Sequence, residues 1–173
     1  MSRLVLAATV AALGLTAFAW RPRWVIHLRG ANTVTYGMTV AEAARSAGDR
    51  LRVEDSGNDN QWECGYVVPD QTSGLSFMTE RGRVVRADVI NPSIRTVSGI
   101  GVGSSEADVR RAYGSQIRVE PHPYGDANDH YMVYVPRDRA DRNYRVIFGT
   151  FDGYVTGYRS GLRPAVEYIE GCL

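Results

Sequence analysis

One loop of this sequence gathers the side chains that metal sites and acid–base catalysts use. The segment 121–130 contains two histidines and two aspartates, namely His122, Asp126, Asp129 and His130. Imidazole and carboxylate groups bind Zn²⁺ and transfer protons, so these residues are weak candidates for a metal site or an active site. The spacing of the histidines matches neither common two-histidine zinc motif. We therefore expect a hydrated polar loop, with no catalytic residue, metal or cofactor; a small periplasmic enzyme or metal-binding protein remains the alternative.

The elements around this loop can be recognised because one stretch of sequence occurs twice. Residues 37–48 and 103–114 both begin and end with glycine, and their offset is 66 at each end (103 − 37 and 114 − 48). In both copies a hydroxyl residue precedes an acidic residue by three positions, which is the pattern of a helix capping box: Thr39 with Glu42, and Ser105 with Asp108. The closing glycine suits a left-handed position after a helix. Each copy therefore predicts a short capped helix.

Short segments rich in valine, tyrosine, phenylalanine and isoleucine follow each predicted helix and indicate strands. Phe151–Tyr154 contains the Asp-Gly signature of a two-residue hairpin, and Glu80–Arg83 is the matching turn of the first copy. Strands joined by short turns are antiparallel. We therefore predict an α+β fold of two tandem units, 20–98 and 99–173, each a short helix or helical hairpin packed on an antiparallel β-sheet.

The start of the first copy also resembles known families. Val34–Glu42, with the closing Gly48, resembles the start of each unit in the β-lactamase inhibitory protein family, and it is similar to the small lipoprotein subunit of the outer-membrane barrel-assembly machinery. The resemblance implies a unit of helical hairpin plus antiparallel sheet, used twice in the inhibitor. It departs in its cysteines, because each inhibitor unit closes its own disulfide. The resemblance therefore concerns the fold and transfers no contact residue.

The first residues have the pattern of an export signal. A short positive start precedes the apolar run Leu4–Ala19, and Ala17-Phe18-Ala19 fits a cleavage site, so residues 1–19 are predicted to be a signal peptide. An uncleaved membrane anchor is the alternative, because the apolar run approaches spanning length. Either interpretation predicts that the folded part is exported, to the periplasm or beyond, and that any membrane contact is made by this segment.

The cysteine count and the charge balance narrow the class of protein further. Cys64 and Cys172 are the two cysteines, and an even pair in an exported chain is usually bonded. We predict a disulfide between them. The 20 basic residues are matched by 19 acidic ones, so the sequence does not indicate a nucleic-acid-binding protein.

An aromatic surface is the candidate binding site. Alternation along the predicted strands assigns one set of side chains in both copies to the helix-covered face: Tyr66 and Val133, Val68 and Val135, Leu75 and Val146, Phe77 and Phe148, and Val84 and Val155. Their neighbours in the second copy would then form one patch on the opposite face, composed of Met132, Tyr134, Ile147, Phe151, Tyr154 and Tyr158. Such a patch suits a partner, although the N-terminal segment could instead cover it as core.

These observations together favour an exported, non-enzymatic binding protein. We predict that the sheet face of the second unit recognises a protein or peptide partner through the six residues of the aromatic patch. The alternatives are the small enzyme or metal-binding protein described above and an accessory protein of envelope assembly. The sequence does not identify the partner.

Overall fold

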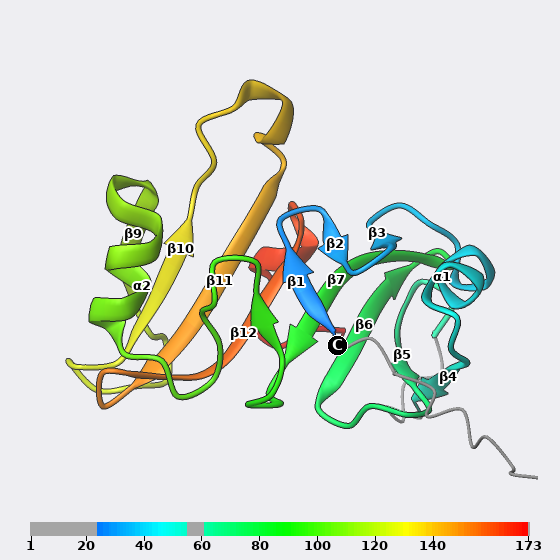
Figure 1. Cartoon of the computed structure of the whole chain (residues 1–173), viewed down its shortest axis with the longest axis horizontal. Helices are drawn as coiled ribbons and strands as arrows, with labels where there is room; N and C mark the ends of the chain where they lie inside the picture. Colours follow the sequence, from blue (N-terminus) through cyan, green and yellow to red (C-terminus); the bar gives the residue numbers. More distant parts are fainter. Residues whose placement is uncertain (1–23, 55–60, 173) are drawn as a thin grey trace, which may run out of the picture.

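The computed structural model describes residues 24–54 and 61–172 as an α+β fold dominated by one large antiparallel sheet (Figure 1). The predicted signal peptide 1–19 lies outside these residues. Eight strands form the sheet, in the order β4-β5-β6-β7-β12-β11-β10-β9. Their bounds are β4 Leu51–Glu54, β5 Cys64–Pro69, β6 Leu75–Glu80, β7 Arg83–Val89, β9 Ile117–Pro121, β10 His130–Tyr134, β11 Tyr144–Phe151 and β12 Tyr154–Leu162.

A smaller sheet and two helices lie on one side of the large sheet. The smaller sheet has the order β3-β2-β1-β8. Its strands are β1 Val25–His27, β2 Gly30–Ala31, β3 Val34–Thr35 and β8 Arg95–Thr96, and the helices are α1 Val40–Ala47 and α2 Glu106–Tyr113. We call this side the helix face. Ile26, Ala43 and Val109 are fully buried there with Phe77 and Phe148 of the large sheet, and they form the main hydrophobic core.

The two predicted capping boxes are present. Thr39 accepts a hydrogen bond from the Glu42 amide, and the Glu42 carboxylate accepts one from the Thr39 amide at 2.8 Å. Ser105 and Asp108 make the same pair of bonds before α2. Gly48 has the left-handed conformation expected after α1. Gly114 differs from the prediction: its φ of 58° is positive, but its ψ of −137° leads the chain into the short 3₁₀ helix η1, Gly114–Gln116.

Equivalent contacts recur in what we call the first half, residues 24–98, and the second half, residues 99–172. Each half contributes four consecutive strands, and β7 joins β12 at the centre of the sheet. Both predicted two-residue turns are present, because Arg81 and Gly82 have positive φ, as do Asp152 and Gly153. The Gly37 amide donates to Val84 at 2.7 Å, and the Gly103 amide donates to Val155 at 2.8 Å. The same backbone frame therefore supports both helices.

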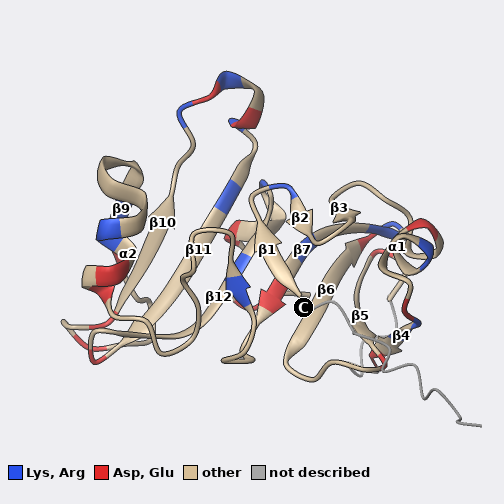
Figure 2. Ribbon diagram, viewed as in Figure 1, with Lys and Arg blue, Asp and Glu red and all other residues tan. Residues whose placement is uncertain are grey.

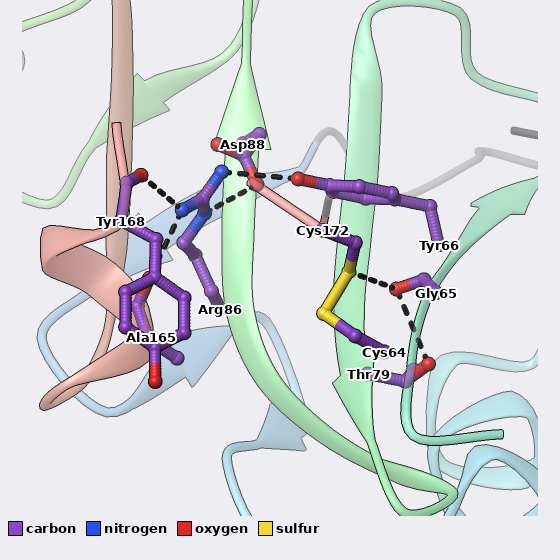
Figure 3. Close-up of a disulfide and its surroundings, with 9 residues drawn as sticks. All are labelled: Cys64, Gly65, Tyr66, Thr79, Arg86, Asp88, Ala165, Tyr168 and Cys172. Carbon is purple, nitrogen blue, oxygen red and sulfur yellow. Dashed lines mark hydrogen bonds and ion pairs between the residues drawn. A yellow bond between two sulfur atoms is a disulfide. The ribbon is translucent and has the colours of Figure 1, made fainter. Parts of the chain in front are cut away.

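The other side of the sheet is crossed by the last described residues, 163–172, which we call the C-terminal strap. The strap begins after β12, passes through the 3₁₀ helix η3, Ala165–Glu167, and reaches β5, where Cys172 is bonded to Cys64 (Figure 3). The Cα atoms of the two cysteines are 5.4 Å apart, which confirms the predicted disulfide. We call this side of the sheet the strap face.

A buried arginine holds the middle of the strap. Arg86 of β7 is 4% exposed, and its guanidinium donates to the carbonyl oxygens of Ala165 and Tyr168 at 3.0 and 2.9 Å (Figure 3). It also donates to the Asp88 carboxylate at 2.8 Å and to the Tyr66 hydroxyl at 3.2 Å. These contacts satisfy a charge that would otherwise be costly to bury. The strap is thus fixed at its middle by Arg86 and at its end by the disulfide.

We predict that replacing both cysteines by serine lowers the free energy of unfolding by about 4–5 kcal/mol. The bond spans 108 positions, and a closed loop of that size removes much conformational entropy from the unfolded chain. Denaturant titration of the double variant against the wild-type protein measures the difference. A loss below about 1 kcal/mol would show that the Arg86 contacts hold the strap without the covalent bond.

Candidate functional site

The six residues of the predicted aromatic patch do not share one face, so this prediction was wrong. Met132 and Tyr158 are buried in the main core on the helix face, and Tyr134 packs against it with its ring 4.9 Å from Tyr113. Ile147 points to the strap face but is buried beneath Val166. The other two residues, Phe151 and Tyr154, remain partly or largely exposed, at 39% and 57%.

The strand register explains the error for the inner strands. Val67 is paired with Phe77, and Met132 is paired with Phe148. Directly paired residues point to the same side of a sheet, so Val67 and Met132 lie on the helix face. The neighbouring residues pack instead in clusters on the strap face, namely Tyr66, Val133 and Val135. The predicted assignment of these residues, together with Val68, to the helix-covered face was therefore wrong for these three.

A β-bulge explains the error for Tyr158. The pairing of β11 with β12 shifts between Gly149 and Thr150, so that Phe148 opposes Tyr158 while Thr150 opposes Val155. The shift adds a residue to one strand, and strict alternation then fails across it. Val155 and Tyr158 therefore both point into the core, three positions apart. The first half has the equivalent shift between Met78 and Thr79.

Three aromatic rings do form a cluster on the strap face of the second half. The His122 ring is 4.5 Å from the ring of Tyr131 and 4.6 Å from that of Phe151. The Arg159 guanidinium lies 4.9 Å from the centre of the Tyr131 ring, within range of a cation–π contact. We call His122, Tyr131, Phe151 and Arg159 the aromatic cluster.

The aromatic cluster borders a shallow cleft of about 210 Å³. Gly149 and Gly157 also line it, as does Ile90, whose side chain is 70% exposed. Because Ile90 follows β7 and the rings belong to the second half, both halves contribute to the cleft. Of the predicted patch, Phe151 and Tyr158 line this cleft. Tyr131 was not predicted as a site residue, because alternation along the sequence assigned the faces of β10 the wrong way round and His122 was considered only as a metal candidate.

The candidate metal and acid–base residues are separated. His122 belongs to the aromatic cluster on the strap face, whereas His130 bonds to Glu106 of α2 on the helix face. The Asp129 carboxylate accepts hydrogen bonds from the Asp126 and Asp152 amides at 2.8 and 3.1 Å, which lower its pKa. Asp129 thus stabilises the loop. Within residues 24–54 and 61–172, no group of three or more histidine, cysteine, aspartate or glutamate side chains could hold a metal ion.

His130 belongs to a polar cluster that fastens α2 to the sheet. The Glu106 carboxylate lies 2.7 Å from His130 Nδ1 and accepts a hydrogen bond from the Thr150 hydroxyl at 2.7 Å. Partial burial acts to raise the pKa of Glu106, but the hydrogen bonds from Thr150 and His130 outweigh it and lower the pKa. The charged form of Glu106 is therefore favoured by folding.

A larger pocket lies in the first half, between the start of α1 and strands β4 to β7. Its volume is about 600 Å³, and its apolar lining includes Val40, Val53 and Trp62. Trp62 is 71% exposed and Val53 is 61% exposed, so both present apolar surface at this pocket. This pocket could not be predicted from the sequence, because neither an exposed tryptophan nor the alternation of the strands indicates an empty space between elements.

We predict that Glu106→Gln lowers the free energy of unfolding by about 1 kcal/mol or more at pH 7, because it removes charge-assisted hydrogen bonds. A carboxylate whose pKa is lowered by folding stabilises the protein above its unfolded value, about 4.3, and loses that effect as the pH falls through its folded value. The difference from wild type should therefore shrink below pH 4. Glu120→Gln, on exposed β9, is the control in denaturant titrations at both pH values. A pH-independent difference would contradict the assignment.

The comparisons with known proteins inform the fold alone. No protein-family model matches the chain, and no curated protein sequence matches it either. The uncharacterised protein yfeY of Escherichia coli is similar in structure, with a TM-score of 0.51 and 12% identity over 80% of this chain and 99% of that one. An extracellular SCP-domain protein of Bacillus anthracis has a TM-score of 0.46 and 15% identity over 76% of this chain and 45% of that one. The similarity to yfeY covers nearly the whole of that protein.

Proposed function

We propose that this chain is an exported, non-enzymatic binding protein made of two tandem α+β units, 20–98 and 99–173, and that the second unit recognises a peptide segment of a protein partner. The cleft beside the aromatic cluster is the observation that carries this proposal. The cleft takes the place of the predicted aromatic patch as the candidate binding site. It lies on the strap face, and the patch was also expected on the side of the sheet opposite the helices.

The tandem arrangement is supported by matched contacts. Both halves have a capping box, a four-strand meander, a two-residue turn with positive φ and a bulge at corresponding positions. This repetition also supports the resemblance to the β-lactamase inhibitory protein family and to the barrel-assembly lipoprotein, whose units combine helices with an antiparallel sheet. The resemblance concerns the fold and does not identify the partner.

Export is supported by the disulfide between Cys64 and Cys172, because such bonds persist in oxidising compartments outside the cytoplasm. The signal-peptide pattern of residues 1–19 also favours export. In the part of the chain that the structure describes, no helix is long and apolar enough to span a membrane. We propose, from the disulfide and the signal-peptide pattern, that the partner is met in the periplasm or outside the cell.

The chemistry of the cleft suits an apolar or aromatic side chain of a peptide. Phe151 and Ile90 offer exposed apolar surface, while Gly149 and Gly157 contribute no side chains that would fill the space. Tyrosine, with its rigid amphipathic ring, is a frequent anchor in binding sites, and Arg159 adds a cation beside it. The alternative enzyme or metal site gains no such support, since His122 and His130 lie on opposite faces of the sheet.

We predict that Phe151→Ser weakens peptide binding at least tenfold, since removing a central anchor typically costs about 2 kcal/mol or more. Peptides can be selected from a random library on the purified protein, and their affinities measured by calorimetry. Val97→Ser is the control, because it removes a 70% exposed apolar side chain after β8, outside the cleft. Peptides that bind the Phe151→Ser and wild-type proteins equally would reject the cleft as the site.

A further inference from the structure

The pocket beside α1 has a counterpart in the second half that is filled. Gly65 is paired with Thr79 in the sheet, and His130 is paired with Thr150 in the same way. Likewise, Val40 follows the N-cap of α1 as Glu106 follows that of α2. In the second half the His130 imidazole is bonded to the Glu106 carboxylate. At the equivalent positions of the first half, Gly65 has only a hydrogen atom and Val40 has an isopropyl group.

The shared threonine shows that the backbone is the same at both places. Thr79 donates to the carbonyl oxygen of Gly65 at 3.3 Å, and Thr150 donates to that of His130 at 3.1 Å. In the second half the Thr150 hydroxyl, which has one proton to donate, is also within hydrogen-bond distance of the Glu106 carboxylate at 2.7 Å, whereas Val40 offers no acceptor in its side chain. At the two positions that hold His130 and Glu106 in the second half, the first half thus has smaller residues, Gly65 and Val40, and both line the pocket.

The local geometry keeps the pocket open. A Cβ atom at residue 65 would lie 2.8 Å from the Gln61 carbonyl oxygen, so no side chain fits there unless the backbone shifts. At the rim, the Trp62 ring lies over Gly82, where an added Cβ would lie 2.8 Å from its Cζ3. The indole is thus placed against the turn between β6 and β7 and lines the pocket. A large apolar ring is unfavourable in water unless something covers it.

The charges at the pocket favour a ligand of one sign. Arg81 and Arg83 line it, and none of the described lining residues is acidic. Arg83 donates one hydrogen bond to the Gly37 carbonyl oxygen at 2.8 Å, and the other N–H groups of its guanidinium can bind a ligand. Glu42 is near enough to Arg83 for their charges to interact, but its carboxylate caps α1 through the Thr39 amide and hydroxyl. Two guanidinium groups beside an apolar space are complementary to an anion that carries an apolar chain.

We propose that this pocket binds the anion of a medium-chain fatty acid. The chain lies against Val40, Val53 and Trp62, and the carboxylate is held by Arg81 and Arg83. The volume of about 600 Å³ is within the range of small-molecule sites, whereas the cleft of about 210 Å³ is smaller. This site is separate from the peptide cleft and does not depend on it.

Calorimetry with dodecanoate and with dodecylamine, both below their micelle concentrations, tests the ligand class. The two probes have chains of equal length and head groups of opposite charge. We expect one-to-one binding of dodecanoate with a Kd of about 100 µM or tighter, from the typical affinity per non-hydrogen atom of such ligands. We expect binding at least tenfold weaker for dodecylamine. No saturable dodecanoate binding, or equal binding of both probes, would overturn the proposal.

Variants locate the site. Trp62→Ala removes the apolar rim, and Val40→Glu supplies the residue of the second half, which is tolerated in the first turn of a helix. Each should weaken dodecanoate binding at least tenfold, whereas Val97→Ser and Phe151→Ser should leave it unchanged. The double variant Arg81→Asn and Arg83→Gln should remove the preference for dodecanoate over dodecylamine. Unchanged dodecanoate binding in both Trp62→Ala and Val40→Glu, with near-ultraviolet circular dichroism showing a native fold, would exclude the pocket.

Discussion

The buried guanidinium of Arg86 is the contact on which the strap face depends. It bonds to two carbonyl groups of the C-terminal strap, to Asp88 of its own strand and to Tyr66 of β5 (Figure 3). Gly161 of β12 is paired with Arg86, and a side chain there would come within 3.0 Å of its Cα and Cβ atoms. The pairing of β7 with β12 and the position of the strap are thus determined at one place, because a buried charge tolerates little displacement of its partners.

The two candidate sites use one frame in different ways. Both halves provide a helix whose first turn is bonded to the turn between two long strands, yet one half leaves a pocket there and the other closes it with Glu106 and His130. On the strap face, the aromatic cluster occupies the second half, while the disulfide and Arg86 occupy the first (Figure 3). Charged residues of both signs alternate in the loop between β10 and β11, away from either site (Figure 2). Similar backbone arrangements in the two halves therefore carry side chains with different contacts.

Local chemistry could be predicted from the sequence, and register could not. The capping boxes of Thr39 and Ser105, the Asp152-Gly153 turn and the disulfide depend on a few adjacent residues or on the compartment, and the structure contains them all. The faces of Met132 and Tyr158 depend on how strands distant in sequence are paired and on a bulge that interrupts the alternation. No pattern along a single strand records an insertion relative to its neighbour. The pocket could not be predicted for the same reason. Gly65 is recognised as the equivalent of His130 only when the strands of the two halves are compared in space.

The position of the disulfide has a consequence for how the protein is made. A chain is synthesised from its N-terminus, so the thiol of Cys64 exists 108 positions before its partner does. Since these are the two cysteines of the sequence, no competing intramolecular bond can form in the interval. All eight strands of the large sheet precede Cys172 in the chain, so every one of them has been synthesised before the covalent link can form. The bond thus forms only after the strap has been synthesised, and a chain that ends before Cys172 cannot be closed by it.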